Sequence, residues 1–345
     1  MKLGLRRQTL RLREPLHTSY GDVTERELAI VSLEGSDGVS GFGEAAPLPA
    51  YGGPDMEQVW EALEKYRPVV EGAAEDPGGG VRLIEACREQ VDLPEAIAAL
   101  DMALWDRAGR RSGKSVAALL SEEHATSVPV NATLSAVDRS GAAAQAEQAG
   151  REGFGCLKVK VGTGDDAGRV AAVRAAAGPE MRLRLDANGA WDVEQAVRSI
   201  EALEPAGLEL VEEPAHGLEA VRAIRERVAV RVSIDETAGV AGALGAGIAD
   251  AVCLKVSRCG GIGPLLVAAS LVRATGAEIY LASTLDGPLG VAAALHAAAA
   301  LASRGPLPHC GLATLGMFEG LDDPLAPREG AIEVPSAPGL GVDPL

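Results

Sequence analysis

Charged residues recur at a regular spacing where strand-like segments end in the middle of the chain. The segment CLKVKV contributes Lys158 and Lys160, which are followed along the chain by Asp186, Glu212, Asp235 and Lys255. The gaps after Lys160 are 26, 26, 23 and 20 residues. Each gap has the length of one strand–helix unit, so we expect successive strands to bring these charges to the same edge of a sheet.

The three carboxylates of this series predict a metal site. Asp186, Glu212 and Asp235 would repel one another on adjacent strands unless a cation lay between them. Oxygen ligands without histidine or cysteine favour Mg²⁺, with Mn²⁺ as a possible substitute. The alternative is that each acid caps the next helix or pairs with a neighbouring lysine, which is common for any single acid but explains three in succession poorly.

The lysines predict proton transfer. Alternation along a strand places Lys158 and Lys160 on the same face, and a parallel sheet is covered on both faces, so both side chains should point inward. A lysine acts as a base only when its pKa falls, and both the like charge of Lys158 and a nearby divalent ion would lower the pKa of Lys160. Lys255, four strands away, should face Lys160 across the metal.

The elements that would position these residues form a repeat. Strand-like segments at 128–134, 156–161, 182–187, 208–213, 230–235, 251–256, 278–283 and 309–314 alternate with amphipathic helical stretches such as VEQAVRSIEALE. This pattern predicts an α/β fold, a TIM-like (β/α)7β barrel over residues 126–314. No glycine fingerprint follows the first segment, and we interpret CGGIG at 259–263 as turn glycines and not as a phosphate-binding loop.

The residues before the predicted barrel follow a different pattern of secondary structure. Residues 1–125 predict an α+β capping domain, with a strand at RELAIVSLEG, a loop at SGFGEAAPLPAYGGPD and helices at MEQVWEALEKYRPVVEG and PEAIAALDMALWDRAGRRSG. The Pro/Gly-rich segment 315–345 is expected to pack back onto this domain.

Composition restricts the class of protein. The formal net charge of −17 argues against nucleic acid and anionic membranes as partners, but a local cluster of cations still allows a small carboxylate substrate. Five scattered cysteines without a CxxC motif indicate reduced thiols, and the N-terminus lacks an apolar signal segment. We therefore predict a soluble cytoplasmic protein.

The ordered motifs KVKVG, LRLDANGAW, LVEEP, SIDET and CLKVSRCGG, with GFGEAAPLP in the first domain, resemble the enolase superfamily and its muconate-lactonizing subgroup. The resemblance implies proton transfer by Lys160 and Lys255 and Mg²⁺ ligation by Asp186, Glu212 and Asp235. It implies that Glu213 turns away from the metal. It also implies a homo-oligomer and abstraction of a proton α to a carboxylate, whose enediolate the metal stabilises.

Less specific motifs indicate which reaction to expect. VPVNATL, ASTLDGPLG and HCGLATLGMF look most like o-succinylbenzoate synthases, which dehydrate a cyclohexadienyl carboxylate in menaquinone biosynthesis. In that interpretation Lys160 removes the α-proton and then protonates the departing hydroxide, while Lys255 stays charged. The alternatives are an N-acylamino acid racemase, a dipeptide epimerase, a muconate-type cycloisomerase, or a barrel that only binds a metabolite.

The same resemblance assigns supporting residues. Lys158, Asn131, Asn188, Ser283 and Asp286 are expected to bind substrate or support the site, with Asn131 and Ser283 near the substrate's carboxylate groups. A loop at Tyr20–Gly21 or at Tyr51–Gly52 would close over the substrate. HCGLATL contains no acid, whereas dipeptide epimerases usually carry an acidic motif there to hold the substrate ammonium, so this segment argues against an epimerase.

Overall fold

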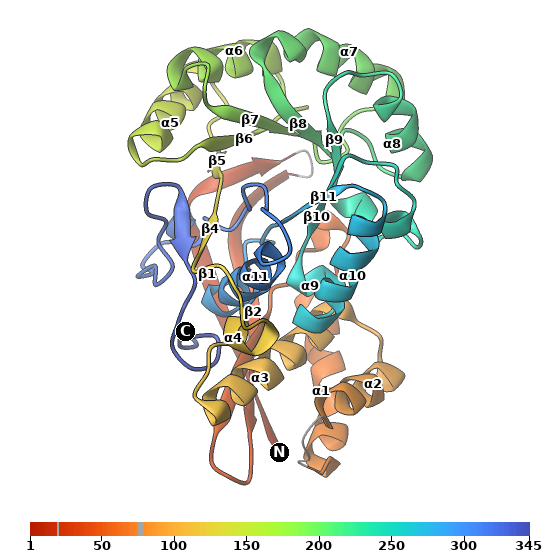
Figure 1. Cartoon of the computed structure of the whole chain (residues 1–345), viewed down its shortest axis with the longest axis vertical. Helices are drawn as coiled ribbons and strands as arrows, with labels where there is room; N and C mark the ends of the chain where they lie inside the picture. The colour runs from red at the N-terminus through yellow and green to blue at the C-terminus, as the bar shows by residue number, and fades with distance from the viewer. Residues whose placement is uncertain (19–20, 75–78) are drawn as a thin grey trace.

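Two sheets of different kinds organise the chain in the computed structural model, which describes residues 1–18, 21–74 and 79–345 (Figure 1). The first is antiparallel, with the order β1-β2-β3, and the second is parallel, with the order β11-β10-β9-β8-β7-β6-β5. A short antiparallel pair, β4 with β12, lies beside them. In Figure 1 the parallel sheet curls beneath an arch of helices, and the N-terminal helices lie at the opposite end of the molecule.

The N-terminal sheet packs against three helices. Its strands are β1 (Lys2–Thr18), β2 (Gly21–Glu34) and β3 (Ser40–Ala45), and the helices are α1 (Met56–Gly72), α2 (Gly79–Gln90) and α3 (Pro94–Ser112). The two helical stretches and the strand RELAIVSLEG predicted here are confirmed. A separate core of buried apolar residues joins this sheet to the three helices.

The loop predicted at SGFGEAAPLPAYGGPD is wrong in its first part, because Ser40–Ala45 forms strand β3. Its glycines allow close packing instead of a turn. A Cβ atom on Gly41 would lie 2.2 Å from the carbonyl oxygen of Ala103, and one on Gly43 would lie 2.1 Å from that of Ala99. These two glycines therefore let β3 pack directly on the backbone of α3.

Local sequence sets where the helices begin. Asp55 and Gln58 form a capping box at the start of α1, and Asp192 and Gln195 form another at the start of α7 (Val193–Leu203). The CGGIG segment forms the turn into α10 (Ile262–Ala274), with Gly261 at φ 124°. The interpretation as turn glycines is confirmed, because Asp101 of α3 accepts the backbone N–H of Ile262 at 2.6 Å and so occupies this helix start.

The parallel sheet follows the predicted repeat. Its strands are β5 (Ala132–Leu134), β6 (Cys156–Lys160), β7 (Arg182–Asp186), β8 (Leu208–Glu212), β9 (Val232–Ile234), β10 (Ala251–Leu254) and β11 (Glu278–Leu281). The helices between them include α5 (Arg139–Arg151), α6 (Asp166–Ala177), α7, α8 (Leu218–Arg225) and α10, and α11 (Pro288–Ala302) follows β11. The predicted helices VEQAVRSIEALE, GLEAVRAIRERV and IGPLLVAASLVRATG are confirmed as α7, α8 and α10.

The two ends of the predicted barrel differ from expectation. The segment 128–134 is divided into β4 (Ser127–Pro129), which pairs with β12 (Ala331–Glu333), and β5, which joins the parallel sheet. The segment 309–314 is not a regular strand but makes single parallel bridges, Val130 with Cys310 and Ala282 with Gly311. These bridges reach towards both edges of the curled sheet, while an eighth full strand does not form, and complete closure stays a prediction.

One crossover of the parallel sheet lacks an α-helix. Residues 235–250, all of which the structure describes, connect β9 to β10 through only two short 3-10 turns, η3 (Glu236–Gly239) and η4 (Ala243–Gly245). The sequence ETAGVAGALGAG contains four glycines, and Gly242 and Gly247 adopt positive φ angles of 84° and 61°. Glycine at this density disfavours helix, because its backbone loses the most entropy on ordering.

The C-terminal segment contacts the N-terminal elements at several points. Phe318 bridges to Leu12 of β1, and Gly339 bridges to Ser115, which caps α4 (Val116–Leu120). The backbone N–H of Leu340 donates to Asp106 of α3 at 2.7 Å. The domain limits at residues 125 and 315 stay predictions.

A buried histidine in this region makes folding stability sensitive to acid. His296 of α11 accepts the N–H of Ala117 and lies 3.1 Å from the carbonyl oxygen of Leu340, and burial lowers its pKa to about 4. The unfolded chain takes up this proton near pH 6.5 and the folded chain only near pH 4. The stability that the neutral ring provides is therefore present above pH 6.5 and is lost as the pH falls to 4.

We therefore expect the destabilisation caused by His296→Gln, measured by urea unfolding, to shrink by about 3 kcal/mol between pH 7 and pH 4. Ser270→Ala, at an exposed residue without a titratable side chain, is the control and should have the same effect at both pH values. An equal loss of stability in the His296 variant at both pH values would contradict this assignment.

Among the helices that the structure describes, none combines the length and the apolar character that a membrane crossing requires. All five cysteines are free thiols, as their scattered positions predict.

Candidate active site

The six charged residues singled out in the sequence meet at the carboxyl edge of the parallel sheet. Lys158 and Lys160 lie on β6, Asp186 and Glu212 end β7 and β8, and Asp235 and Lys255 directly follow β9 and β10. The strand register pairs Lys160 with Asp186 and Asp186 with Glu212. Five of these six side chains are buried, and the sixth, that of Lys158, is only slightly exposed.

The ammonium groups bind directly to the carboxylates. Lys158 Nζ lies 2.8 Å from both Asp186 Oδ2 and Glu212 Oε1 and so bridges two strands. Lys160 Nζ donates to Asp186 Oδ2 at 2.7 Å, and Lys255 Nζ donates to Asp235 Oδ2 at 2.5 Å. Three buried acids and three buried lysines therefore balance in charge, which is what allows them to leave water together.

These contacts decide the protonation of the lysines. Burial by itself favours the neutral amine of Lys160, but the charge of Asp186, its hydrogen bond and the nearby Tyr51 together outweigh burial, and the pKa of Lys160 is raised. Burial acts on Lys255 in the same direction, and Asp235 together with Cys253 and Glu236 reverses the effect and raises the pKa of Lys255. The like charge of Lys158 does lower the pKa of Lys160, as expected, but the contribution of Asp186 is larger, so the net pKa of Lys160 is raised.

The carboxylates have opposite shifts. Burial would raise the pKa of Asp186, but Lys158 and Lys160 overcome it and lower the pKa below its usual range. Glu212 is fully buried and has one lysine partner, so burial prevails and its pKa is raised. The site thus holds one strongly ionised acid between two lysines.

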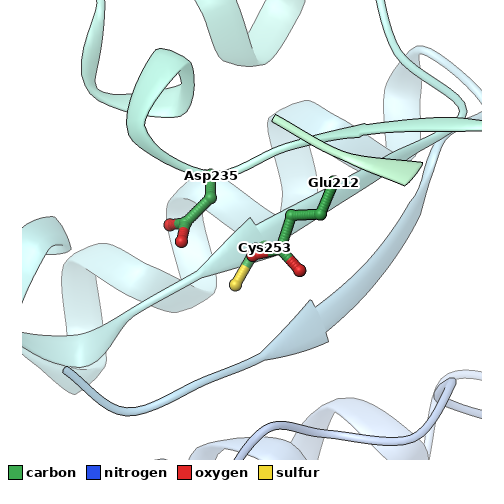
Figure 2. Close-up of side chains that lie close together, drawn as sticks. All are labelled: Glu212, Asp235 and Cys253. Atoms are coloured by element: carbon green, nitrogen blue, oxygen red, sulfur yellow. The ribbon is translucent and has the colours of Figure 1, made fainter. Parts of the chain in front are cut away.

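The donor atoms fit a divalent cation. Ligand atoms of Glu212, Asp235 and Cys253 lie within 4.8 Å of one another, and Figure 2 shows these three side chains turned towards a common point. Asp186 is connected to Glu212 through the shared ammonium of Lys158. Buried carboxylate oxygens from three adjacent strands suit Mg²⁺. Asp186 is not part of this group of converging ligand atoms, and the ligand set Asp186, Glu212 and Asp235 stays a prediction.

Two contributors to this cluster escaped the sequence analysis. Cys253 lies two residues before Lys255, so strand alternation places both side chains on one face, and burial raises the pKa of its thiol. Tyr280 of β11 donates its hydroxyl to Glu212 Oε2 at 2.8 Å and lies 2.8 Å from Ser233 Oγ. The alternation was available for Cys253, whereas the contact of Tyr280 requires the curvature of the sheet.

Glu213 turns away from the metal ligands, as the resemblance implies, and holds the next loop. Its carboxylate accepts the backbone N–H groups of Asp235 at 2.8 Å and Thr237 at 3.1 Å. Glu213, Asn188 and Leu285 have positive φ angles of 40°, 44° and 57°, and each lies shortly after a strand of the parallel sheet. Unfavourable backbone of this kind persists where surrounding contacts enforce it, and it is concentrated at functional sites.

Glu213 should therefore act as a positioning residue for Asp235. We expect Glu213→Gln to lower kcat/KM and the affinity for Mg²⁺ by about 10- to 100-fold, the usual cost of losing a group that orients a metal ligand. Glu219→Gln, at an exposed glutamate on the following helix, is the matched control. Unchanged Mg²⁺ affinity in Glu213→Gln would show that Asp235 is oriented without it.

The remaining predicted residues differ in how they are placed relative to Lys160 and the catalytic cavity. Asn188 supports Lys160 directly, because its Oδ1 accepts the ammonium at 2.7 Å. Ser283 lines the catalytic cavity and lies 2.9 Å from Thr314 Oγ1. Asp286 lines no described cavity and instead accepts the hydroxyl of Thr284 at 2.5 Å, while Asn131 is buried beside Cys310 and Gly311.

The first domain contributes the cover of the site. The Nζ atoms of Lys160 and Lys255 lie 5.9 and 5.8 Å from the centroid of the Tyr51 ring, so this aromatic ring faces both lysines. Tyr51 ends a short 3-10 turn, η1 (Pro49–Tyr51), that Gly52 closes at φ 70°. Of the other proposed loop, Gly21 begins β2, whereas Tyr20 lies outside the described residues.

A catalytic cavity of about 70 Å³ lies between these groups. Lys158, Lys160, Asp186, Asp235 and Lys255 form one side of it. Neutral side chains from both parts of the chain form the other, among them Leu16, Leu48, Thr133, Ser283, Thr314 and Met317. The arrangement can bind an anionic group next to two amines and a set of metal-ligating oxygens.

Comparison with known families agrees with this geometry. The family described as mandelate racemase / muconate lactonizing enzyme, N-terminal domain, matches residues 2–121, and the enolase C-terminal domain-like family matches residues 141–345. The chain belongs to the enolase superfamily, in its muconate-lactonizing group. It is an enzyme of that superfamily, and the lysines and acids described above lie within the C-terminal match.

Several relatives of different activity resemble the chain. It is 32% identical to the o-succinylbenzoate synthase of Thermobifida fusca, covering 93% of this chain and 85% of the relative. It is 30% identical to a hydrophobic dipeptide epimerase of Enterococcus faecalis, covering 87% and 86%. The crystal structure of a dipeptide epimerase from Enterococcus faecalis V583, complexed with Mg and the dipeptide L-Leu-L-Tyr, superimposes with a TM-score of 0.90 at 27% identity, covering 99% and 98%.

Proposed function

We propose that the enzyme removes a proton α to the carboxylate of a small substrate and then eliminates water in a syn sense, forming o-succinylbenzoate. The observation that carries this proposal is the placement of Lys160 and Lys255, which come from β6 and β10 and both face the Tyr51 ring at about equal distance beside three buried acids. A binding protein has no need of two buried amines at such a position.

Each of these residues has a separate role in the proposed reaction. Lys160, once neutral, takes the α-proton, and the resulting ammonium returns a proton to the departing hydroxide, so that water leaves as the new double bond forms. Lys255 stays charged and stabilises the enediolate, and Asn188 orients Lys160 through its amide oxygen. When bound to the three carboxylates, Mg²⁺ would supply Lewis-acid stabilisation of the enediolate and would neutralise the acid that now raises the pKa of Lys160.

Dehydration is favoured by the neutral side of the cavity. Ser283, Thr314 and Met317 come from segments after β11, and the stretch Cys310–Thr314 offers no carboxylate that could hold a substrate ammonium. The resemblance to the Thermobifida fusca enzyme supports the same reaction.

The test is a spectrophotometric dehydration assay with the cyclohexadienyl substrate of o-succinylbenzoate synthases and saturating Mg²⁺. We expect turnover with the wild-type enzyme and formation of the aromatic product. Absence of turnover, with Mg²⁺ binding demonstrated in the same sample, would exclude this reaction.

The second candidate is a 1,1-proton transfer, as in an N-acylamino acid racemase or dipeptide epimerase. A muconate-type cycloisomerisation remains the other alternative. The likeness to the Enterococcus faecalis epimerase and its structure favours the 1,1-proton transfer. Incubation of chiral N-acyl amino acids and dipeptides in ²H₂O separates the two: a racemase or epimerase incorporates deuterium at the α-carbon and inverts it, whereas a committed dehydratase does neither. Localisation in the cytoplasm and assembly into a homo-oligomer stay predictions.

A further inference from the structure

A second and larger cavity adjoins the catalytic cavity on the side of Lys255. It has a volume of about 600 Å³ and lies between the β9–β10 crossover and helices α9 (Val256–Cys259) and α10. Tyr51, Asp235, Lys255 and Thr284 line both cavities. The two cavities therefore meet at these four residues, and a ligand held beside Asp235 and Lys255 lies next to this lateral cavity.

The missing helix of the β9–β10 crossover accounts for the lateral cavity. The short turns η3 and η4 cover less of the sheet than a helix would, and α10 is left with an uncovered apolar side. Val240, Val267 and Leu271 line the cavity while they are 45%, 63% and 52% exposed. Large hydrophobic residues with this exposure are few among the described residues, and three of the five lie here. Such a cluster marks a binding surface.

The two cavities differ in the size of the group that each can hold. About 70 Å³ holds roughly five water-sized groups, which is enough for a carboxylate and the atoms next to it. Pockets for whole small ligands have roughly 300–1,000 Å³, and the lateral cavity falls within that range at about 600 Å³. A substrate whose carboxylate lies beside the two lysines must extend out of the catalytic cavity.

We propose that the lateral cavity is a substrate subsite that binds an uncharged apolar substituent, an alkyl chain or ring, of the carboxylate whose α-carbon faces Lys255. This inference rests on the proposed function for the position of the carboxylate. The lining favours an uncharged group, because it includes Leu244, Val267, Ala268 and Leu271, while the carboxylates of Asp235 and Glu236 that also line it would repel an anionic substituent. The nearby charge of Arg258 is engaged, lying 3.9 Å from Glu95 and donating to the carbonyl oxygen of Tyr51.

The experiment measures binding, so it does not depend on turnover. Acetate, butyrate and hexanoate are titrated by NMR into the wild-type enzyme with saturating Mg²⁺. Burial of each methylene in an apolar cavity should raise the affinity about fourfold. Val267→Glu and Leu271→Glu should lower the affinity for hexanoate at least about tenfold and leave that for acetate unchanged. Val137→Glu, at a valine that is 53% exposed and outside the described cavities, is the matched control.

The outcomes separate this inference from the proposed function. Equal affinity for acetate and hexanoate, with dehydration activity intact, would overturn the subsite alone. Failure of every carboxylate to bind would overturn the proposed function and the subsite together. If Val267→Glu instead changed the oligomeric state in gel filtration and left the dependence on chain length intact, the apolar face would belong to an interface between copies and the subsite would be wrong.

Discussion

Replacing Lys160 with alanine should reduce turnover at least about a thousandfold, because a positioned acid–base group contributes roughly 10²- to 10⁴-fold and, in the proposed reaction, this lysine would serve in both halves. Lys160 is buried, donates to Asp186 and Asn188 at 2.7 Å each, and lies next to the ring of Tyr51. The loss should appear mainly in kcat, since the carboxylates that would hold Mg²⁺ remain and the substrate's carboxylate would bind to that ion. It is measured as the initial rate of dehydration at saturating Mg²⁺.

Two further variants make the result specific. Lys160→Met keeps the length of the side chain and removes the amine, and it should be as inactive as Lys160→Ala. Lys65→Ala, at an exposed lysine of α1, should retain full activity. Because removing one partner of a buried ion pair also costs stability, each variant is compared with the wild type by thermal unfolding. Wild-type turnover in a folded Lys160→Met enzyme would contradict the assignment of the base and revive the interpretation as a metabolite-binding barrel.

Replacing Asp235 with asparagine should weaken Mg²⁺ binding at least about a hundredfold and remove most of the activity, since it takes away a ligand charge. Asp235 lies within 4.8 Å of the ligand atoms of Glu212 and Cys253, and it is the direct partner of Lys255 at 2.5 Å. A ligand that binds only the folded state raises its unfolding temperature with the logarithm of its concentration. Added Mg²⁺ should therefore raise the unfolding temperature of the wild type and have little effect on the variant.

Chelation provides an independent measurement. Treatment of the wild-type enzyme with a chelator should abolish turnover, and added Mg²⁺ should restore it. Asp92→Asn changes a carboxylate that is 71% exposed, lies between α2 and α3 and lines no described cavity, and it should keep the full response to Mg²⁺. An equal rise of the unfolding temperature in wild type and Asp235→Asn would show that the ion binds elsewhere.

The catalytic series was predictable because it depends on chain periodicity. A spacing of about one strand–helix unit between Lys160, Asp186 and Glu212 brings residues to one edge of any parallel sheet, whatever the details of packing. The same reasoning applies to Lys158, which strand alternation places beside Lys160. It correctly predicted that Lys158 lowers the pKa of Lys160 but not the net shift, because the pKa also depends on the direct contact of Lys160 with Asp186 at 2.7 Å, which raises it.

Other features required the third dimension. Gly41 and Gly43 looked like loop residues, yet they serve close packing of β3 against α3, which only the position of that helix reveals. The segment at Cys310 and Gly311 carries the composition of a strand but makes only bridges. The residue pattern of a single segment does not show how many neighbouring strands will pair with it.

The repeat, the order of the charged residues and the family motifs were predictable from the chain, because they depend on spacing along it. The folded arrangement was needed to show that Tyr51 of the first domain faces both lysines, that Glu213 holds the loop carrying Asp235, and that the glycine-rich β9–β10 crossover leaves an apolar cavity beside Lys255. Each of these contacts joins residues far apart in sequence, so it forms only when the curvature of the sheet and the docking of the two parts bring them together.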